Sequence, residues 1–235
     1  GGRENIRWLD ACEGFATALR KAGHHWDALQ QSEHVLQRCR DYLGADHMYT
    51  LRAAADLING RRAVGDLVRA EELARQTHDL CRESDAPDVL LFTVLVNLAS
   101  VLRAAGRPDR ALPFDDQATK GFIKIHGDRH PFTLAATINY LSDLAACGRL
   151  GEAIRLGEET LAKCHLYLGE DHPDTLMAAA NLSCDETAAG DEASGDGRLA
   201  EVLRVYERTL TLEHPEARAA AQRARLTTEI EPYDL

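Results

Sequence analysis

The chain has 235 residues, of which 45% are hydrophobic, and it carries a formal net charge of −11 at pH 7. This acidic balance argues against a nucleic-acid-binding protein, which would show a basic face. No run of eighteen apolar residues occurs, so the sequence predicts no membrane-spanning helix.

Residue usage predicts an all-α protein in a reducing compartment. Alanine, leucine, arginine and glutamate are abundant, whereas proline is scarce and runs of β-branched residues are almost absent. The six cysteines form no CxxC pair, and nothing resembles a signal peptide, which favours a cytoplasmic location. The chain begins Gly-Gly without a methionine, so it is interpreted as a fragment or processed chain that can have further domains upstream.

Three landmarks recur along the chain with a period of 41 or 42 residues. A nine-residue element reads LGADHMYTL at 43–51, HGDRHPFTL at 126–134 and LGEDHPDTL at 168–176. One slot is held by Asp56, Asn97, Asn139 and Asn181, and similar turns begin at Gly23, Gly65, Gly106 and Gly148. A recurrence of this length predicts stacked helical hairpins, each of which buries its apolar face against its neighbours.

The landmarks divide the chain into five predicted hairpins and one final helix, all within a single repeat domain, 1–235. The hairpins span roughly 3–42, 43–84, 85–125, 126–167 and 168–212, with a glycine turn between the two helices of each. The last hairpin is expected to carry a seven-residue surface loop between Gly190 and Gly197. A polar helix over 214–229 is expected to cap the array, and residues 229–235 are expected to fray.

The pattern LGxDHPxTL, followed by NL and then GRxxEA, resembles the tetratricopeptide repeat in its 42-residue form, as in kinesin light chains. The resemblance covers nearly the whole chain and is strongest over 126–182. It implies a right-handed α-solenoid of about five helical hairpins with a C-terminal capping helix, in which the first helix of each hairpin lines a concave groove. The fold alone does not decide the function.

The chain also resembles C-terminal repeat arrays of actinobacterial regulators, such as the repeat protein of FxSxx-COOH peptide-maturation systems. Proteins of that group often end in D-I-E-P, and Glu229-Ile230-Glu231-Pro232 stands in that place with Glu for the Asp. Some of these arrays follow STAND-type nucleotide-switch domains, but no GxxxxGK[ST] loop occurs in this sequence. The resemblance implies a bacterial regulator whose ATPase part would lie outside this chain.

The histidines of the repeated element are the first candidates for chemistry. They recur as His47, His130, His172 and His214. Equivalent positions in stacked hairpins lie about 10 Å apart, whereas zinc needs every ligand within about 2.3 Å of one point. Helix capping is therefore the preferred interpretation, and neither a metal nor another cofactor is predicted.

Cysteines and carboxylate pairs also indicate structure rather than catalysis. Cys39, Cys81 and Cys164 share one position of the second helix, which is typical of small core residues. Pairs such as Glu71-Glu72 and Glu158-Glu159 fall on the outer helices and are expected to be solvated. The sequence therefore predicts no enzyme.

The groove-facing side of the first helices provides the candidate binding residues. Helical spacing around the Asn slot selects Arg52, Asn59, Arg62, Asn97, Ser100, Arg103, Asn139, Ser142 and Asn181. An asparagine amide can both donate to and accept from a peptide backbone, and the arginines would receive acidic groups. In the alternative interpretation, the asparagines satisfy the neighbouring helix and the arginines pair with glutamates of the outer helices.

These residues predict a scaffold that holds an extended peptide in its groove, with no nucleic-acid or membrane partner. If the second resemblance holds, the ligand is a small ribosomal precursor peptide with a C-terminal carboxylate. The alternative is a sensor or oligomerisation arm of a larger STAND-type signalling ATPase or regulator, which a P-loop domain upstream would favour.

Overall fold

A computed structural model describes residues 2–230, with side chains from Trp8 onward. Over this range the chain forms eleven α-helices and no strand, so the predicted all-α fold class is confirmed. The helices are α1 (Gly2–Lys21), α2 (His25–Leu43), α3 (Met48–Ala63), α4 (Leu67–Glu83), α5 (Asp88–Ala104), α6 (Pro108–His126), α7 (Pro131–Ala146), α8 (Leu150–Tyr167), α9 (Pro173–Ala188), α10 (Glu192–Thr209) and α11 (Pro215–Ala221). Within the described residues, no helix combines the length and apolar character needed to cross a membrane.

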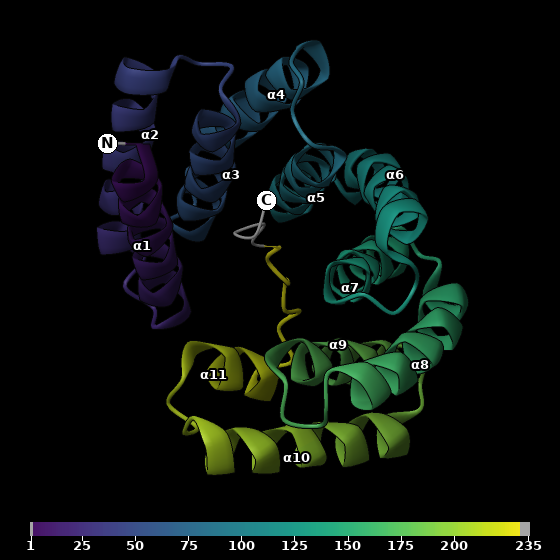
Figure 1. Cartoon of the computed structure of the whole chain (residues 1–235). Helices are drawn as coiled ribbons and strands as arrows, with labels where there is room; N and C mark the ends of the chain where they lie inside the picture. Colours follow the sequence, from purple (N-terminus) through teal and green to yellow (C-terminus); the bar gives the residue numbers. More distant parts are fainter. Residues whose placement is uncertain (1, 231–235) are drawn as a thin grey trace. The chain divides into compact units, whose positions relative to one another are not determined.

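Residue contacts divide the described chain into two compact units, residues 2–107 and residues 108–230. In unit 1, α1, α3 and α5 form one layer, and α2 and α4 pack against it (Figure 1). Part of its core consists of Leu51, Ala55, Cys81, Leu90 and Val94, which join α3, α4 and α5. Each helix therefore buries one face against the next hairpin, as a repeat array requires.

In unit 2, α7 and α9 form the inner layer, and α6, α8 and α10 pack against them (Figure 1). The core between these layers includes Leu134, Ile138, Leu161, Leu182 and Tyr206. Chain that follows α11 continues beside α7 and α9, so α9 lies between this last segment and α10 (Figure 1).

Histidine caps set the start of four helices in the same way. In each case the histidine Nδ1 accepts a hydrogen bond from the backbone N–H of the residue two positions later. The N···N distances are 3.3, 3.2, 3.1 and 3.4 Å for His47, His130, His172 and His214 respectively. At the last three of these starts, proline follows as the first helical residue, where its missing N–H is not needed. The capping interpretation of the repeated histidines is confirmed.

The threonine of the repeated element closes the loop before the helix. Thr50 and Thr133 each donate from Oγ1 to the carbonyl oxygen of the glycine six residues earlier, at 2.7 and 2.8 Å. That glycine is Gly44 in one case and Gly127 in the other, and both have the positive φ that glycine adopts without strain. At 43–51 and 126–134 the element thus combines a glycine turn, a histidine cap and a threonine hydrogen bond, whereas Thr175 Oγ1 of the third copy makes no hydrogen bond to the described residues.

The seven-residue surface loop expected after Gly190 is absent, and that expectation was wrong. Gly190 itself makes the turn, with φ of 91°, and α10 begins two residues later, so Gly195 and Gly197 lie inside a helix. A Cβ on Gly195 would lie only 2.2 Å from Thr187 Oγ1 and 2.8 Å from the Ser183 carbonyl oxygen. This glycine therefore permits close packing of α10 on α9, which is a helix-packing role rather than a loop role.

The final helix is much shorter than the expected span of 214–229. It ends at Ala221, and Arg223 then adopts a φ of 53°, which breaks the helix. Residues 225–230 have no helical hydrogen bonding, and burial alternates along them from Leu226 to Ile230. An extended, buried segment replaces the frayed end expected at 229–230, whereas the expectation for 231–235 lies outside the described residues.

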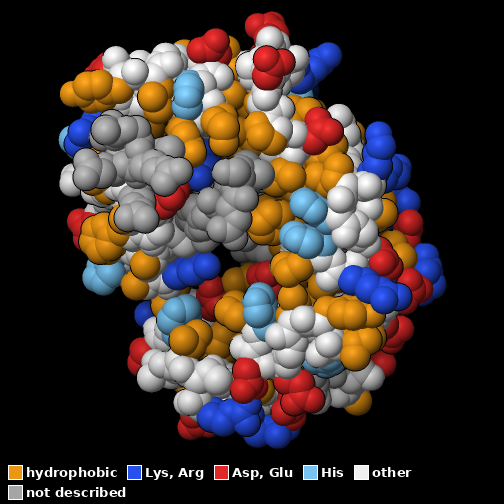
Figure 2. Space-filling view, viewed as in Figure 1, with side chains coloured by type: hydrophobic (Ala, Val, Ile, Leu, Met, Phe, Trp, Pro, Cys, Tyr) orange, Lys and Arg blue, Asp and Glu red, His pale blue; other side chains and the backbone are white. Residues whose placement is uncertain are grey.

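The outer helices carry exposed charges as expected at Glu72, Glu158 and Glu159, whereas Glu71 is half-buried and pairs with Arg107 at 2.5 Å. On the side of unit 2 drawn in Figure 2, acidic and basic side chains lie next to one another over the outer helices. The outer helices also carry exposed ion pairs between residues one helical turn apart. These are Arg155 with Glu159 on α8 and Arg204 with Glu201 on α10. Such pairs favour helix formation and solubility, but they contribute little to the free energy of unfolding.

Candidate functional site

The inner face of unit 2 is the side of α7 and α9 that contacts residues 223–230, which we call the C-terminal segment. Asn139 and Asn181 occupy the same position on their helices, because each lies eight residues after the proline that begins the helix (Pro131 and Pro173). The shared cap and proline therefore place both amides at the same angle around their helix axes. Both side chains are buried, and both contact the C-terminal segment.

Each asparagine binds the backbone of one residue through two hydrogen bonds. Asn181 Nδ2 donates to the Leu226 carbonyl oxygen at 2.9 Å, and its Oδ1 accepts the Leu226 N–H at 2.8 Å. Asn139 makes the same pair with Thr228, at 2.9 and 3.2 Å. An amide thus supplies one donor and one acceptor in the way that a neighbouring β-strand would.

The two amides select alternate residues of an extended chain. One hairpin step, from Asn181 to Asn139, corresponds to two residues of the segment, roughly 6.6 Å of extended chain. Leu226 and Thr228 therefore point to the same side and are buried. Thr228 Oγ1 also donates to the Ala135 carbonyl oxygen of α7 at 2.7 Å. The inner face recognises the segment chiefly through its backbone.

Two arginines of the segment bind acidic and hydroxyl groups of unit 2. Arg225 forms an ion pair with Asp185 of α9, and Arg223 forms one with Asp196 of α10. A second nitrogen of Arg223 donates to Thr187 Oγ1 at 2.9 Å. Burial raises the pKa of Asp185 above its ordinary value, although Arg225 acts in the opposite direction. Cations of the segment therefore meet carboxylates of the repeat array.

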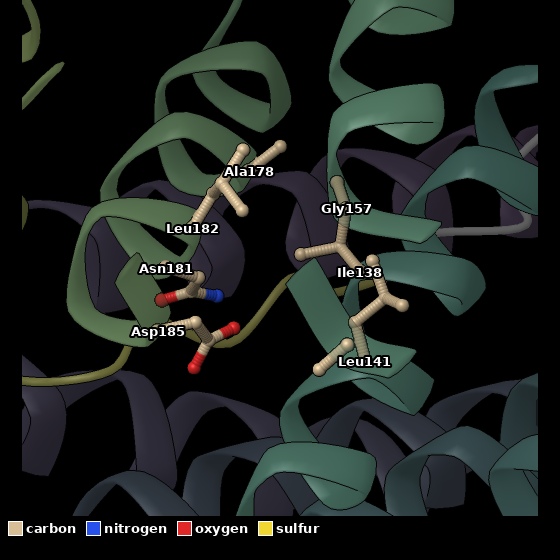
Figure 3. A pocket seen from close by; sticks show the side chains of 8 residues that line it. Ile138, Leu141, Gly157, Ala178, Asn181, Leu182 and Asp185 are labelled. Atoms are coloured by element: carbon tan, nitrogen blue, oxygen red, sulfur yellow. The ribbon is translucent and has the colours of Figure 1, made fainter. Parts of the chain in front are cut away.

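A small cavity adjoins the inner face but is no ligand pocket. It measures about 10 Å³ and lies among α7, α8 and α9, beside Asn181 and Asp185 (Figure 3). This volume suits a single water molecule at most. Gly157 lines it, and a Cβ there would already approach a Leu182 methyl group to 3.1 Å. The chemistry of this face therefore belongs to the extended segment.

Ser142, another predicted site residue, supports the neighbouring amide. It lies on α7, donates to the Ile138 carbonyl oxygen at 3.1 Å and accepts from Asn181 Nδ2 at 3.5 Å. Ser142 therefore contacts the amide of Asn181, and its hydrogen bonds are to α7 and α9.

Arg52 does not face an open groove as expected, because acidic side chains of α1 enclose it. It is 3% exposed and forms ion pairs with Asp10 and with Glu13, the latter at 2.8 Å. In the same cluster Arg20 pairs with Asp56 at 2.7 Å. The positive charges of Arg20 and Arg52 are thus paired with carboxylates inside unit 1.

Burial in this cluster raises the pKa of Glu13 to about 8, although Arg52 acts in the opposite direction. The nearby charges of Asp10 and Asp56 raise it further. A protonated Glu13 leaves two carboxylates, Asp10 and Asp56, against the guanidinium groups of Arg20 and Arg52.

The remaining predicted residues of unit 1 are bonded to their own unit or packed in it. Asn97 donates to the Ala55 carbonyl oxygen of α3 at 3.0 Å, which corresponds to the alternative interpretation in which the amide satisfies a neighbouring helix. Arg103 donates to Ser100 on the same helix at 3.3 Å. Asn59 is buried and Arg62 is half-buried, both on α3. The structure places these residues in unit 1, whereas Asn139, Ser142 and Asn181 lie in unit 2.

Sequence reasoning missed the segment itself and the acidic residues that bind it. Asp185 and Asp196 were not among the candidates. The alternation of Leu226, Thr228 and Ile230 is a strand signal that was available in the sequence. It was overlooked because a polar capping helix was expected at the end of a repeat array.

No residue cluster with metal-binding or nucleophilic character emerges in the described part of the chain. In residues 8–230, no three His, Cys, Asp or Glu side chains gather where they could hold a metal ion. Cys39, Cys81 and Cys164 are buried, and burial raises the pKa of each thiol, so thiolate formation is disfavoured. Their expected role as core residues is confirmed.

Comparison with known proteins identifies the repeats. Two family models, both described as Tetratricopeptide repeat, match residues 8–48 and 90–162. No curated protein matches the chain. The chain therefore contains tetratricopeptide repeats, over the residues that these models cover.

Solved structures show the same fold. Nearly identical TPR-like repeats of a Podosopora anserina protein described as a kinesin light chain are 22% identical, with a TM-score of 0.66 over 87% of this chain and 97% of that one. A second structure from the same source has 22% identity and a TM-score of 0.64 over 88% and 98%. BtubC from P. vanneervenii has 15% identity and a TM-score of 0.63 over 87% and 80%.

Proposed function

We propose that this tetratricopeptide-repeat chain is a scaffold that binds an extended segment of a partner protein on the inner face of unit 2. One observation carries the proposal: Asn139 and Asn181 each hold one backbone residue of an extended chain by two hydrogen bonds. Backbone groups are common to all peptides, so a device that binds residues 226 and 228 can bind an external segment in the same way. The chain's own C-terminal segment then acts as a stand-in for the ligand.

The kind of ligand expected from the sequence needs revision on this face. A precursor peptide with a C-terminal carboxylate stays a prediction, but Arg52 already pairs with Asp10 and Glu13. On the inner face of unit 2, Arg225 and Arg223 of the segment pair with carboxylates, Asp185 and Asp196 respectively. We therefore base the proposed function on backbone recognition at the asparagines rather than on carboxylate recognition at the arginines.

The test must weaken the intramolecular ligand without removing it. A tethered segment competes at an effective concentration in the millimolar range, so the unaltered chain should bind an external peptide weakly. Thr228→Pro in the full chain removes the N–H that Asn139 accepts and the hydroxyl that bonds to Ala135. Thr227→Pro is the matched control, because residue 227 is less buried and is not held by an asparagine.

Binding is measured by fluorescence anisotropy with a labelled peptide of residues 222–230, QRARLTTEI. We expect the Thr228→Pro chain to bind it more tightly than the unaltered and Thr227→Pro chains. Adding Asn139→Ala should weaken binding by roughly 0.5–1.5 kcal/mol for each of the two hydrogen bonds removed. Absence of binding to the Thr228→Pro chain, or equal binding with and without Asn139, rejects the proposed function.

A further inference from the structure

The arginines of the C-terminal segment indicate which partner the inner face selects. Resting on the proposed function, we propose that this face takes a basic segment: two cationic residues two positions apart, followed at once by alternating apolar or β-branched residues. The template is Arg223-x-Arg225-Leu226-x-Thr228-x-Ile230.

The acidic partners of the segment carry this assignment. The Asp185 side chain is only 4% exposed, and its ion pair with Arg225 reaches across from α9. A bound segment without a cation there would leave a buried carboxylate uncompensated, which is far more costly than the absence of an exposed ion pair. Asp185 therefore discriminates against neutral and acidic segments at the position of Arg225.

Asp196 provides a second, more accessible contact. Its side chain is 68% exposed, and it pairs with Arg223, which also donates to Thr187. The two acidic residues lie on different helices, α9 and α10, and bind residues two positions apart on the segment. Two separate carboxylates thus match two cations that are two positions apart, where the chain leaves the turn at Arg223 and becomes extended.

The neighbouring acidic group does not share this role. Glu186 follows Asp185 on α9 but binds Arg198 of α10 through two nitrogens, at 2.6 and 2.9 Å. Its charge is therefore balanced inside the unit. The selectivity for basic segments falls on Asp185 and Asp196.

Burial sets the rest of the pattern. Leu226 joins the apolar core of unit 2, while Thr228 and Ile230 are 1% and 3% exposed. Position 227, between Leu226 and Thr228, is only half-buried and accepts a wider choice of side chains. A charged residue at 226 or 228 would lose its hydration without a partner, so these positions require apolar or hydroxyl-bearing side chains.

The proposal is tested with two peptides on the full Thr228→Pro chain. One is QRARLTTEI, and in the other both arginines are replaced by glutamate. We expect the acidic peptide to bind at least about tenfold more weakly, and the affinity of the basic peptide to fall as salt is raised. Asp185→Asn should reduce the preference for the basic peptide, whereas Glu201→Gln, which removes an equal charge from an exposed pair on α10, should leave it unchanged.

A charge exchange separates recognition from simple destabilisation. In the Thr228→Pro chain, Asp196→Arg should bind a peptide that carries glutamate only at the position of Arg223 better than the parent chain does. Equal affinity of the basic and acidic peptides overturns the basic-segment assignment while leaving backbone recognition intact. Absence of binding by either peptide overturns the proposed function, and the assignment with it.

The other possible occupant is the C-terminal segment of a second copy. Sedimentation of the unaltered chain over a range of concentrations measures this directly. A monomer at every concentration supports a segment from another protein as the external ligand. A dimer that Asn139→Ala abolishes would overturn that choice in favour of exchange between copies.

Discussion

At the scale of single residues, identical asparagines perform different tasks according to what lies opposite them. Asn97, Asn139 and Asn181 occupy the same repeat position, yet Asn97 binds a carbonyl of the adjacent helix and the other two bind an extended segment. An amide carries one donor group and one acceptor, so it is satisfied by either partner. Repeat position therefore determines where the amide points, and the local partner determines its function.

Glu13 gives unit 1 a specific dependence of stability on pH. Its pKa is about 8 in the folded chain against an ordinary value of 4.5, with burial as the main cause. Between these values the folded state binds more protons than the unfolded state. The contribution of Glu13 is therefore fully present below about pH 4.5 and is lost as the pH rises through about 8.

We expect Glu13→Gln to flatten this dependence, because glutamine remains neutral at every pH. The measurement is the thermal midpoint at pH 5, 6.5 and 8.5 at constant ionic strength, where 1 kcal/mol corresponds to roughly 2–4 °C for a chain of this size. Glu33→Gln, in an exposed pair with Arg61, is the control and should retain the slope. If the thermal midpoints of the unaltered and Glu13→Gln chains changed with pH in parallel, Glu13 would be ionised when buried.

At the scale of helices, the cap made by His130 couples the start of α7 to pH. His130 Nδ1 accepts the Phe132 N–H, and its ring stacks on His126 with centroids 4.2 Å apart. Burial and the charge of His126 lower the pKa of His130 below its ordinary value of 6.5. The stabilisation by this cap is thus present above pH 6.5 and is lost as the pH falls through the lower, folded value.

His130→Ala should cost about 1 kcal/mol of unfolding free energy at pH 7.5, because the cap is lost. His130→Asn should retain most of the unfolding free energy at that pH. The cap that asparagine forms should not weaken when the pH is lowered, because an amide does not titrate. Urea unfolding at pH 7.5 and 5.5 measures both effects. His165→Asn, at an exposed position within α8, should behave as the unaltered chain does.

Two glycines of α10 give opposite predictions in the same helix. Gly195→Ala should destabilise unit 2 by about 1–3 kcal/mol, because its Cβ would meet Thr187 and the Ser183 backbone. Gly197→Ala has no atom within 4 Å of the new Cβ, and it should stabilise the helix by about 0.4–1 kcal/mol. Chemical denaturation of both variants decides the point. Similar effects from the two substitutions would show that α10 does not pack on α9 through Gly195.

At the scale of the whole molecule, the sequence allowed the repeat pattern to be predicted because it is local and periodic. Glycine turns at 23, 65, 106 and 148 and the histidine caps act within a few residues, so their spacing is visible directly. The C-terminal segment could not be placed in that way. Thr228 binds Ala135, 93 residues away, and this pairing depends on the three-dimensional stacking of the hairpins. Only the alternation within the segment itself was available as a local signal.

The attachment of the C-terminal segment predicts how a protease acts on the chain. Trypsin cleaves after Arg223 and Arg225 only when the segment leaves the inner face, because a bound extended chain in a hydrogen-bonded groove is not free to enter a protease. Thr228→Pro should accelerate cleavage at these two bonds several-fold over Thr227→Pro. Mass spectrometry of timed digests at native pH provides the rates. Equal rates in the two variants would show that the asparagine contacts do not retain the segment.

The order of synthesis gives the placement of this segment a further consequence. On the ribosome, α7 and α9 are synthesised before residue 226, and these helices lie close together in the chain. We therefore expect the inner face of unit 2 to form before the C-terminal segment can bind it, because Thr228 follows its partner Ala135 by 93 residues in the sequence. During that interval the amides of Asn139 and Asn181 are open to a segment of another chain. A partner present during synthesis can then bind without competition from the C-terminal segment.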